Sequence, residues 1–308
     1  MKIIFMGTPE FAVPSLEALI NSEHEISLVI CQPDRPKGRG KKVSYPPVKE
    51  LALRYSIPVE QPNNIKDDNF HDLISGLSPD MICVVAYGKI IPWNILDVPK
   101  YGCVNVHASL LPKYRGAAPI NWAIIKGEKI TGITTMLMDE GMDTGDILLK
   151  AETGISKNIT SVELANVLSV QGADLLLRTI SKIEEGSIKP QKQDNRKASY
   201  APLLKKEHGI INWAENSEDI RNLVRGIQPW PGAYTKLNNK ILKIYTVKIS
   251  TGTGDPGEVL RSDSGILRIA TGNGSVDITK LQLEGSKRMS VGDFLRGRDI
   301  EPGTFLGK

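Results

Sequence analysis

The eight residues Asn105-Val106-His107-Ala108-Ser109-Leu110-Leu111-Pro112 end an apolar run that begins near Cys103. In a β-strand, residues i and i+2 project from the same face, so Asn105 and His107 can converge on one substrate atom. Pro112 then ends the strand and opens a loop, and ligands of open α/β sheets bind in such loops. The stretch therefore predicts a sheet strand that carries a functional site at its carboxyl end.

Residues 1–150 alternate short apolar runs with helical patterns, which is typical of a parallel sheet with crossover helices. We expect an α/β fold with a doubly wound, Rossmann-like, mostly parallel sheet. Its strands are predicted at Lys2–Met6, Ile26–Cys31, Asp80–Val85, Cys103–His107, Thr131–Met138 and Ile147–Ala151, and its helices at Phe11–Ile20, Val48–Arg54 and Phe70–Leu77. Thr160 and Glu163 form a capping box for a further helix that ends near Gly186.

The last third of the chain has a different pattern. Residues 187–206 are polar and contain prolines, and Ser217 is expected to cap a short helix. Strand-like runs with turn signals between them follow at Tyr234–Leu237, Leu242–Val247, Gly257–Leu260, Ile266–Ala270 and Val276–Leu283. Strands this short and regularly spaced favour a small β-barrel of oligonucleotide-binding type. We therefore expect a first domain over residues 1–189, a linker over 190–206 and a C-terminal β-barrel over 207–308.

Composition indicates an ordinary globular protein, with 40% hydrophobic and 24% charged residues. No apolar run is long enough to cross a bilayer and the N-terminus lacks a signal-peptide pattern, so we expect a cytoplasmic protein with no membrane partner. The three cysteines form no C-x-x-C pair and are interpreted as reduced structural thiols. All of the net charge of +4 comes from residues 200–308; such a bias is commonly a solvated surface, but on a separate domain it fits contact with a polyanion.

Three polar residues, two at the strand end and one in a later loop, are the candidate catalytic groups. An amide N–H and an imidazole aimed at one point can bind a developing oxyanion and move a proton, which describes Asn105 and His107. Asp143 lies between two glycines and is the candidate for orienting or charging His107. This grouping favours catalysis over the alternative of a buried histidine satisfied by a backbone group. No set of His or Cys ligands accompanies it, so no metal is expected.

These residues also carry a family resemblance. Together with Tyr114–Pro119, the Asn-x-His…Asp set resembles the formyltransferase family that uses 10-formyltetrahydrofolate. Other branches of that family act on glycinamide ribonucleotide and on amino sugars. Two further stretches, Gln32–Lys42 and Gln228–Ala233, resemble the branch that acts on methionyl-tRNA. The resemblance runs from Ile3 almost to the C-terminus.

The resemblance implies a reaction and its substrates. A formyl group would pass from 10-formyltetrahydrofolate to the α-amine of methionine esterified to initiator tRNA, without a metal. The first domain would be the catalytic domain, the barrel would help to hold tRNA, and the enzyme is expected to be a monomer. The residues expected to hold or flank the folate are Ser109, Leu110, Leu111, Pro112, Tyr87 and Gly88.

A basic, glycine-hinged loop follows the second predicted strand. A run of like charges is usually a solvated loop. This one lies where functional loops of α/β sheets are placed, and phosphate contacts draw on lysine and arginine, so we expect it to contact RNA. Its basic residues are Arg35, Lys37, Arg39, Lys41 and Lys42.

The residues leave some alternatives open. A formyltransferase or formyltetrahydrofolate hydrolase acting on a small molecule would keep the same three residues but has no evident use for the basic loop or the basic barrel. A non-catalytic RNA-binding protein would have no need of the Asn-x-His…Asp set. Whether His107 or Asp143 accepts the proton of the amine, through water or directly, also stays open.

Overall fold

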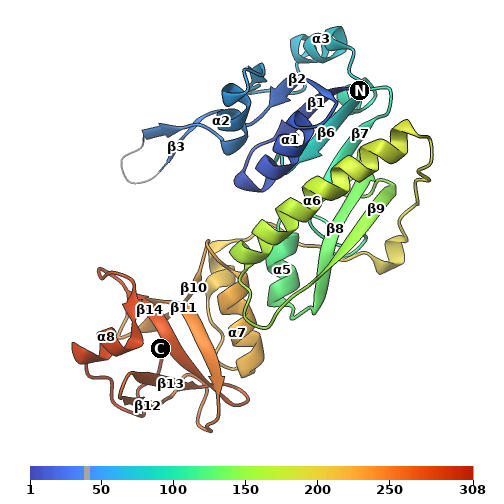
Figure 1. Cartoon of the computed structure of the whole chain (residues 1–308). Coiled ribbons are helices and arrows are strands. Elements are labelled where there is room, and N and C mark those ends of the chain that lie inside the picture. The colour runs from blue at the N-terminus through green and yellow to red at the C-terminus, as the bar shows by residue number, and fades with distance from the viewer. Residues whose placement is uncertain (38–41, 308) are drawn as a thin grey trace. The chain divides into compact units, whose positions relative to one another are not determined.

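The computed structural model describes residues 1–37 and 42–307, and the chain divides into two compact units (Figure 1). The first unit comprises Met1–Pro119, Ile130–Gly154 and Ala165–Ala201, and the second comprises Ile120–Lys129, Ile155–Leu164 and Pro202–Lys308. The chain therefore enters the second unit twice before residue 202. Sequence composition marks only the last of these crossings, because the earlier ones depend on contacts with residues far along the chain.

Seven strands form the sheet of the first unit: β1 (Lys2–Gly7), β2 (Glu25–Ile30), β5 (Val59–Glu60), β6 (Met81–Val85), β7 (Cys103–His107), β8 (Ile130–Leu137) and β9 (Ile147–Gly154). Their order across the sheet is β5-β2-β1-β6-β7-β8-β9. The first five of these pair in parallel, and β8 and β9 are antiparallel. The strand order reverses between β1 and β6, as in a doubly wound sheet. The mostly parallel α/β sheet expected from the sequence is confirmed.

Helices connect and cover these strands. They are η1 (Glu10–Ala12), α1 (Val13–Ile20), α2 (Pro47–Arg54), α3 (Asp68–Leu77), α4 (Trp93–Leu96) and α6 (Ser161–Glu184), of which α6 begins in the second unit. The central strands β1 and β6 are almost wholly buried, because a parallel sheet in an α/β fold is covered on both faces. The predicted capping box is confirmed: the Glu163 N–H donates to Thr160 Oγ1 (3.3 Å) and the Thr160 N–H donates to the Glu163 carboxylate (2.8 Å).

The ends of the basic loop form a short hairpin that the sequence did not predict. Strands β3 (Arg35–Lys37) and β4 (Lys42–Ser44) pair in antiparallel register, with Lys37 opposite Lys42. Two members of the predicted RNA-contacting set, Arg39 and Lys41, lie outside the described residues.

An antiparallel sheet organises the second unit. Its strands are β10 (Ala233–Leu237), β11 (Lys240–Ser250), β12 (Val259–Asp263), β13 (Ile266–Ala270), β14 (Ser275–Leu283) and β15 (Met289–Ser290), and its helices include α5 (Pro119–Ile125), η3 (Lys206–Gly209), α7 (Ser217–Gly226) and α8 (Val291–Arg296). The order is β10-β11-β14-β13-β12, with β15 beside β14. The expected antiparallel β-domain is confirmed.

The last residues of the chain join the two edges of this sheet. The Val259 N–H at the β12 edge donates to the Thr304 carbonyl (2.8 Å). The Gly307 N–H donates to the Lys236 carbonyl in β10 (2.9 Å). The segment 303–307 therefore satisfies backbone groups at both edges, which would otherwise be exposed.

One local prediction in this unit is wrong. The sequence favours Ser217 as the cap of α7, but the cap is Asn216, whose side-chain oxygen accepts from the Asp219 N–H (2.8 Å). Both residue types favour this position, so the sequence alone does not separate two adjacent candidates. Among the described residues, the structure has no helix long and apolar enough to cross a membrane.

Candidate active site

The carboxyl end of β7 holds two of the candidate catalytic residues. Asn105 and His107 project from one face of the strand because side chains alternate along it. β7 lies between β6 and the antiparallel β8, where His107 pairs with Thr134. His107 is buried and Asn105 is half-buried. The amide therefore stays accessible to a substrate while the imidazole is held by its surroundings.

His107 lies between two hydrogen-bond acceptors. Its Nε2 is 3.0 Å from the Tyr114 carbonyl oxygen, and since a carbonyl only accepts, Nε2–H donates to it. Its Nδ1 is 3.5 Å from Oδ1 of Asp143. Only the protonated imidazolium can present an N–H to both acceptors at once. Asp143 lies 36 positions further along the chain, and the fold brings its carboxylate to the His107 ring. From the sequence, Asp143 is the candidate for orienting this ring.

The loop that carries Asp143 is fixed at several points. The second carboxylate oxygen, Oδ2, accepts from the Gly116 N–H (2.7 Å). Asp143 itself has a left-handed backbone, with φ of 56°. At Gly145, a Cβ atom would lie 1.7 Å from the Leu137 carbonyl oxygen, so only glycine fits this approach to β8. The glycine after Asp143 is therefore required by packing.

The loop after β7 is held by two side chains of the neighbouring strands. Thr134 Oγ1 in β8 accepts from the Leu111 N–H (3.1 Å) and donates to the Ser109 carbonyl (2.7 Å). Lys150 Nζ in β9 donates to the Leu111 carbonyl (2.5 Å), and burial lowers the pKa of this lysine. Sequence reasoning did not single out Thr134 or Lys150, because their role depends on strand pairing.

The predicted folate-contacting residues of this loop are not equally accessible. Ser109 is fully buried and its hydroxyl donates to the Lys113 carbonyl (2.6 Å). The Leu111 side chain packs in the core with Met136 and Ile147. Leu110 is half-buried, as is Pro112. The side chains of Leu110 and Pro112 therefore remain partly accessible, whereas Ser109 and Leu111 shape the loop from inside.

Tyr87 and Gly88 follow the carboxyl end of β6. The Tyr87 side chain is only 2% exposed and packs in the hydrophobic core, and burial raises the pKa of its hydroxyl to about 12. Its carbonyl accepts from Thr8 Oγ1 (3.3 Å) and Gln32 Nε2 (3.2 Å). Gly88 has a left-handed backbone and is exposed. Because the Tyr87 ring lies in the core, only the backbone of Tyr87 and Gly88 can face a ligand here.

The base of the basic hairpin is anchored by a charge pair. Lys49 Nζ is 2.7 Å from Asp34 Oδ2, and Gln61 Nε2 donates to Asp34 Oδ1 (2.8 Å). The Lys49 ammonium and then the Gln61 amide lower the pKa of the Asp34 carboxyl. Arg35 is exposed on β3. Strand β3, which begins at Arg35, therefore follows directly after an anchored residue.

A segment that the sequence suggested as a linker contacts the site instead. Residues 191–201, here called the strap, run beside Tyr114–Gly116 through backbone hydrogen bonds such as Arg115 N–H to the Ser199 carbonyl (2.8 Å). Within the strap, Gln193 and Asn195 bind the buried Arg115. The sequence does not indicate this order, because polar side chains suit a solvated linker equally well.

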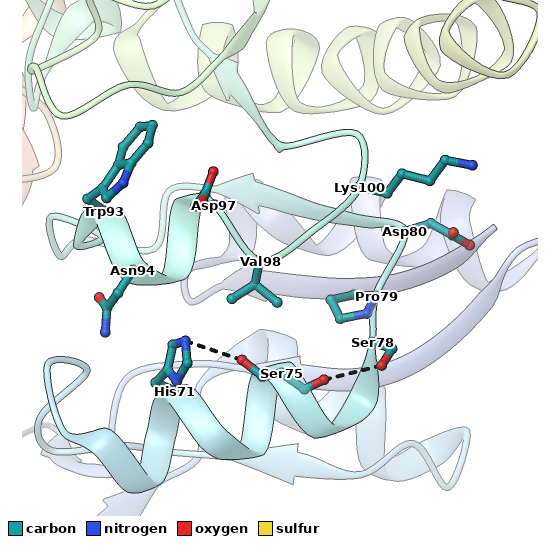
Figure 2. Close-up of a pocket in the computed structure, with 10 residues that line it drawn as sticks. All are labelled: His71, Ser75, Ser78, Pro79, Asp80, Trp93, Asn94, Asp97, Val98 and Lys100. Atoms are coloured by element: carbon teal, nitrogen blue, oxygen red, sulfur yellow. Dashed lines mark hydrogen bonds between the residues drawn. The ribbon is translucent and has the colours of Figure 1, made fainter.

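A cavity of about 650 Å³ lies elsewhere in the first unit (Figure 2). It is lined by residues such as Asp80 and Lys100, which precede β6 and β7, and by side chains of α3 and α4. It therefore opens at the amino ends of the strands, whereas ligands of doubly wound sheets bind at the carboxyl ends. Of the predicted site residues that the structure describes, none lines it. Among the described residues no His, Cys, Asp and Glu side chains gather as a metal-binding group.

Comparison with known proteins defines the class. The model of the formyl transferase family matches residues 1–180, and that of the formyl transferase C-terminal domain matches residues 203–299. The crystal structure of an N-formyltransferase from Helicobacter canadensis, in complex with folinic acid and dTDP-3-aminofucose, shares the fold with a TM-score of 0.69 at 20% identity, over 94% of this chain and 100% of that one. The doubly wound sheet thus belongs to a formyl transferase domain.

Two relatives narrow the assignment. The methionyl-tRNA formyltransferase of Geotalea uraniireducens is 52% identical over 100% of this chain and 98% of its own length. That of Citrifermentans bemidjiense is 50% identical over 100% of this chain and 97% of its own length. The chain belongs to the formyl transferase family, in the branch of the methionyl-tRNA formyltransferases.

Proposed function

We propose that Asn105, His107 and Asp143 carry out the transfer of a formyl group from 10-formyltetrahydrofolate to the α-amine of methionine esterified to initiator tRNA. The observation that carries this assignment is the position of His107 between the Tyr114 carbonyl and the Asp143 carboxylate, beside the accessible amide of Asn105. Oxyanion stabilisation requires donors fixed before the reaction, and this arrangement fixes the imidazole.

The chemistry begins with the neutral amine. A free α-amine has a pKa of about 7.7–8.0, so a substantial fraction is unprotonated near neutral pH. Its lone pair attacks the formyl carbon, a C–N bond forms, and the carbonyl oxygen becomes an oxyanion. The oxyanion accepts from Asn105 and from the Nε2–H of His107, which it shares with the Tyr114 carbonyl in a three-centre hydrogen bond. The amine then loses a proton, N10 of the folate gains one, and the C–N10 bond breaks to release tetrahydrofolate.

Asp143 has two tasks in this proposal. Its Oδ1, 3.5 Å from Nδ1 of His107, orients the imidazole toward the oxyanion. Its carboxylate also offers an acceptor for the proton of the amine, through water. One fixed oxyanion donor is worth about 3 kcal/mol of transition-state stabilisation, or roughly a hundredfold in rate.

The folate would lie along the loop after β7. Leu110 and Pro112 offer partly accessible apolar surface, and Gly88 offers an exposed backbone at the end of β6. Ser109, Leu111 and Tyr87 would act through the backbone that they hold in place. These segments follow neighbouring parallel strands, so they share one edge of the sheet.

The tRNA would be held by basic surface in two places. The residues from 200 onward carry the excess positive charge, and the basic loop supplies Arg35, Lys37, Arg39, Lys41 and Lys42. We propose residues 1–189 as the catalytic domain, 190–206 as the connection and 207–308 as the RNA-binding domain. We also propose that the enzyme is a cytoplasmic monomer.

The test is a formyl-transfer assay with purified protein, 10-formyltetrahydrofolate and methionyl initiator tRNA. Formylation of the charged tRNA is expected, and uncharged tRNA serves as the control. Release of formate without transfer would indicate a hydrolase, and transfer only to a small amine would indicate a different formyltransferase. Binding of tRNA without turnover would reduce the protein to an RNA-binding role.

A further inference from the structure

We propose that Gln193 is a positioning residue for the catalytic centre, and that the strap (residues 191–201) is part of the active site rather than a connection between domains. The proposal rests on the assignment of Asp143 and His107 above. It goes beyond that assignment by naming the groups that fix where Asp143 points.

The side-chain amide of Gln193 makes four hydrogen bonds. Its Nε2 donates to the carbonyl of Asp143 (2.8 Å) and to the carbonyl of Gly145 (2.7 Å). Its Oε1 accepts from Nε (3.1 Å) and Nη2 (2.7 Å) of Arg115. An amide has two N–H donors and two acceptor lone pairs, so all of its capacity is used. A carboxylate of the same shape could not donate to the two loop carbonyls.

Arg115 connects the Gln193 amide to the segment Tyr114–Gly116, which contacts the imidazole at its other nitrogen. The residue is only 3% exposed, and its Nη2 also donates to Asn195 Oδ1 (2.8 Å). Burying a guanidinium is costly unless its donors are satisfied, and the two amide oxygens of the strap accept three hydrogen bonds from it. Arg115 stands between Tyr114 and Gly116, and these are the residues whose backbone contacts His107 and Asp143.

Both residues that contact the imidazole have a left-handed backbone conformation. Tyr114 has φ of 59° and Asp143 has φ of 56°. Neither is glycine, so each conformation persists only where neighbouring structure holds it. The strap bonds both of them: Ser199 Oγ accepts from the Tyr114 N–H (2.9 Å), and Gln193 donates to the Asp143 carbonyl. One segment of chain therefore fixes the peptide on each side of His107.

A close approach keeps the strap in register. At Gly116, where φ is 115°, a Cβ atom would lie 2.8 Å from the Ala201 carbonyl oxygen. The Ala201 N–H in turn donates to the Arg115 carbonyl (2.7 Å). Because Gly116 also donates to Asp143, any shift of the strap is transmitted to the carboxylate through one residue.

The test uses Gln193→Glu and, to separate the effect of charge from the removal of hydrogen bonds, Gln193→Met. The matched control is Asn158→Asp, the same change from an amide to a carboxylate at an exposed residue outside the strap. We expect kcat to fall at least tenfold in both Gln193 variants, with KM for folate and for charged tRNA within about twofold and an unchanged control. A loss confined to KM or to thermal stability would overturn the positioning role.

The decisive readout is the combination with Asp143→Asn. If Gln193 acts through Asp143, the double variant should be no slower than Asp143→Asn alone, and the pH–rate profile of Gln193→Met should move toward that of Asp143→Asn. Additive losses, or an unmoved profile, would overturn the inference. A near-normal rate for Asp143→Asn itself would instead overturn the proposed function, so the two failures are distinguishable.

Discussion

At the scale of single residues, the site depends on the orientation of three side chains, which one strand and two loops determine. Asn105 and His107 share a face of β7, and the ring of His107 is oriented by one carbonyl and one carboxylate. A group so held needs little reorganisation when charge develops on the substrate, which is why fixed donors are effective.

The first prediction concerns these two side chains. Asn105→Ala and His107→Ala should each lower kcat by about a hundredfold, because each removes one donor to the oxyanion. Stopped-time formylation assays at saturating substrates measure the loss, and circular dichroism with folate titration checks that fold and donor binding persist. Either variant with more than about a tenth of the wild-type kcat would contradict the oxyanion role.

At the scale of elements, the loop between β8 and β9 must pass close to its own strand. Gly145 provides this approach, since a side chain there would meet the Leu137 carbonyl at 1.7 Å. The hairpin β3–β4 has a different anchor, the Asp34–Lys49 pair at its base. Each element thus has one contact whose removal should be measurable.

Gly145→Ala should reduce the free energy of unfolding by about 2 kcal/mol and lower kcat, because the added methyl group displaces the loop that carries Asp143. Gly76→Ala is the matched control. That glycine lies in α3 with nothing within 4 Å of an added Cβ, so alanine should stabilise by about 0.5–1 kcal/mol. Urea unfolding measures both; equal behaviour of the two variants would contradict the packing argument.

Asp34→Asn should remove a pH-dependent part of the stability. The folded-state pKa of Asp34 is lowered, chiefly by the Lys49 hydrogen bond, so its contribution is present above the unfolded value of about 3.9 and is lost as the pH falls through the folded value. The stability difference between wild type and variant should therefore be constant near neutral pH and shrink below pH of about 4. Asp299→Asn, the same change at an exposed residue, is the matched control.

At the scale of the whole molecule, the charge is unevenly distributed along the chain. Residues 1–199 carry no net charge, and the excess lies beyond them. A surface that binds a polyanion releases counterions, so its affinity depends on salt in proportion to the number of phosphate groups that it neutralises. The basic loop adds a second region of this kind within the first unit.

Replacing Arg39, Lys41 and Lys42 with alanine should raise the KM for charged tRNA and leave the folate KM unchanged. For every phosphate group that is no longer neutralised, the magnitude of the log–log salt slope should fall by about 0.7 to 0.9. Lys66→Ala removes a charge from an exposed position elsewhere and serves as the control. A parallel rise in both KM values would instead identify the loop as a lid over the folate.

The sequence determined much of the fold by local patterning. It predicts β7 at its observed bounds, Cys103–His107, and β13 at Ile266–Ala270, because apolar alternation and turn residues act within a few positions. It also indicates Asn105 and His107 as a pair, since spacing by two fixes a shared face. Short elements such as α4 and β5 do not emerge from the sequence, because so few residues give no readable period.

Tertiary structure decided what depends on distant partners. The sequence singles out Asp143, but its 3.5 Å approach to His107 and the bond from Gly116 come from the folding of separate loops. The polar residues of the strap predict a linker, yet the Gln193 side chain binds two backbone carbonyls of the Asp143 loop and the buried Arg115. A polar side chain can form hydrogen bonds with water or with a buried polar group of the protein. Only the three-dimensional arrangement decides which of these partners it has.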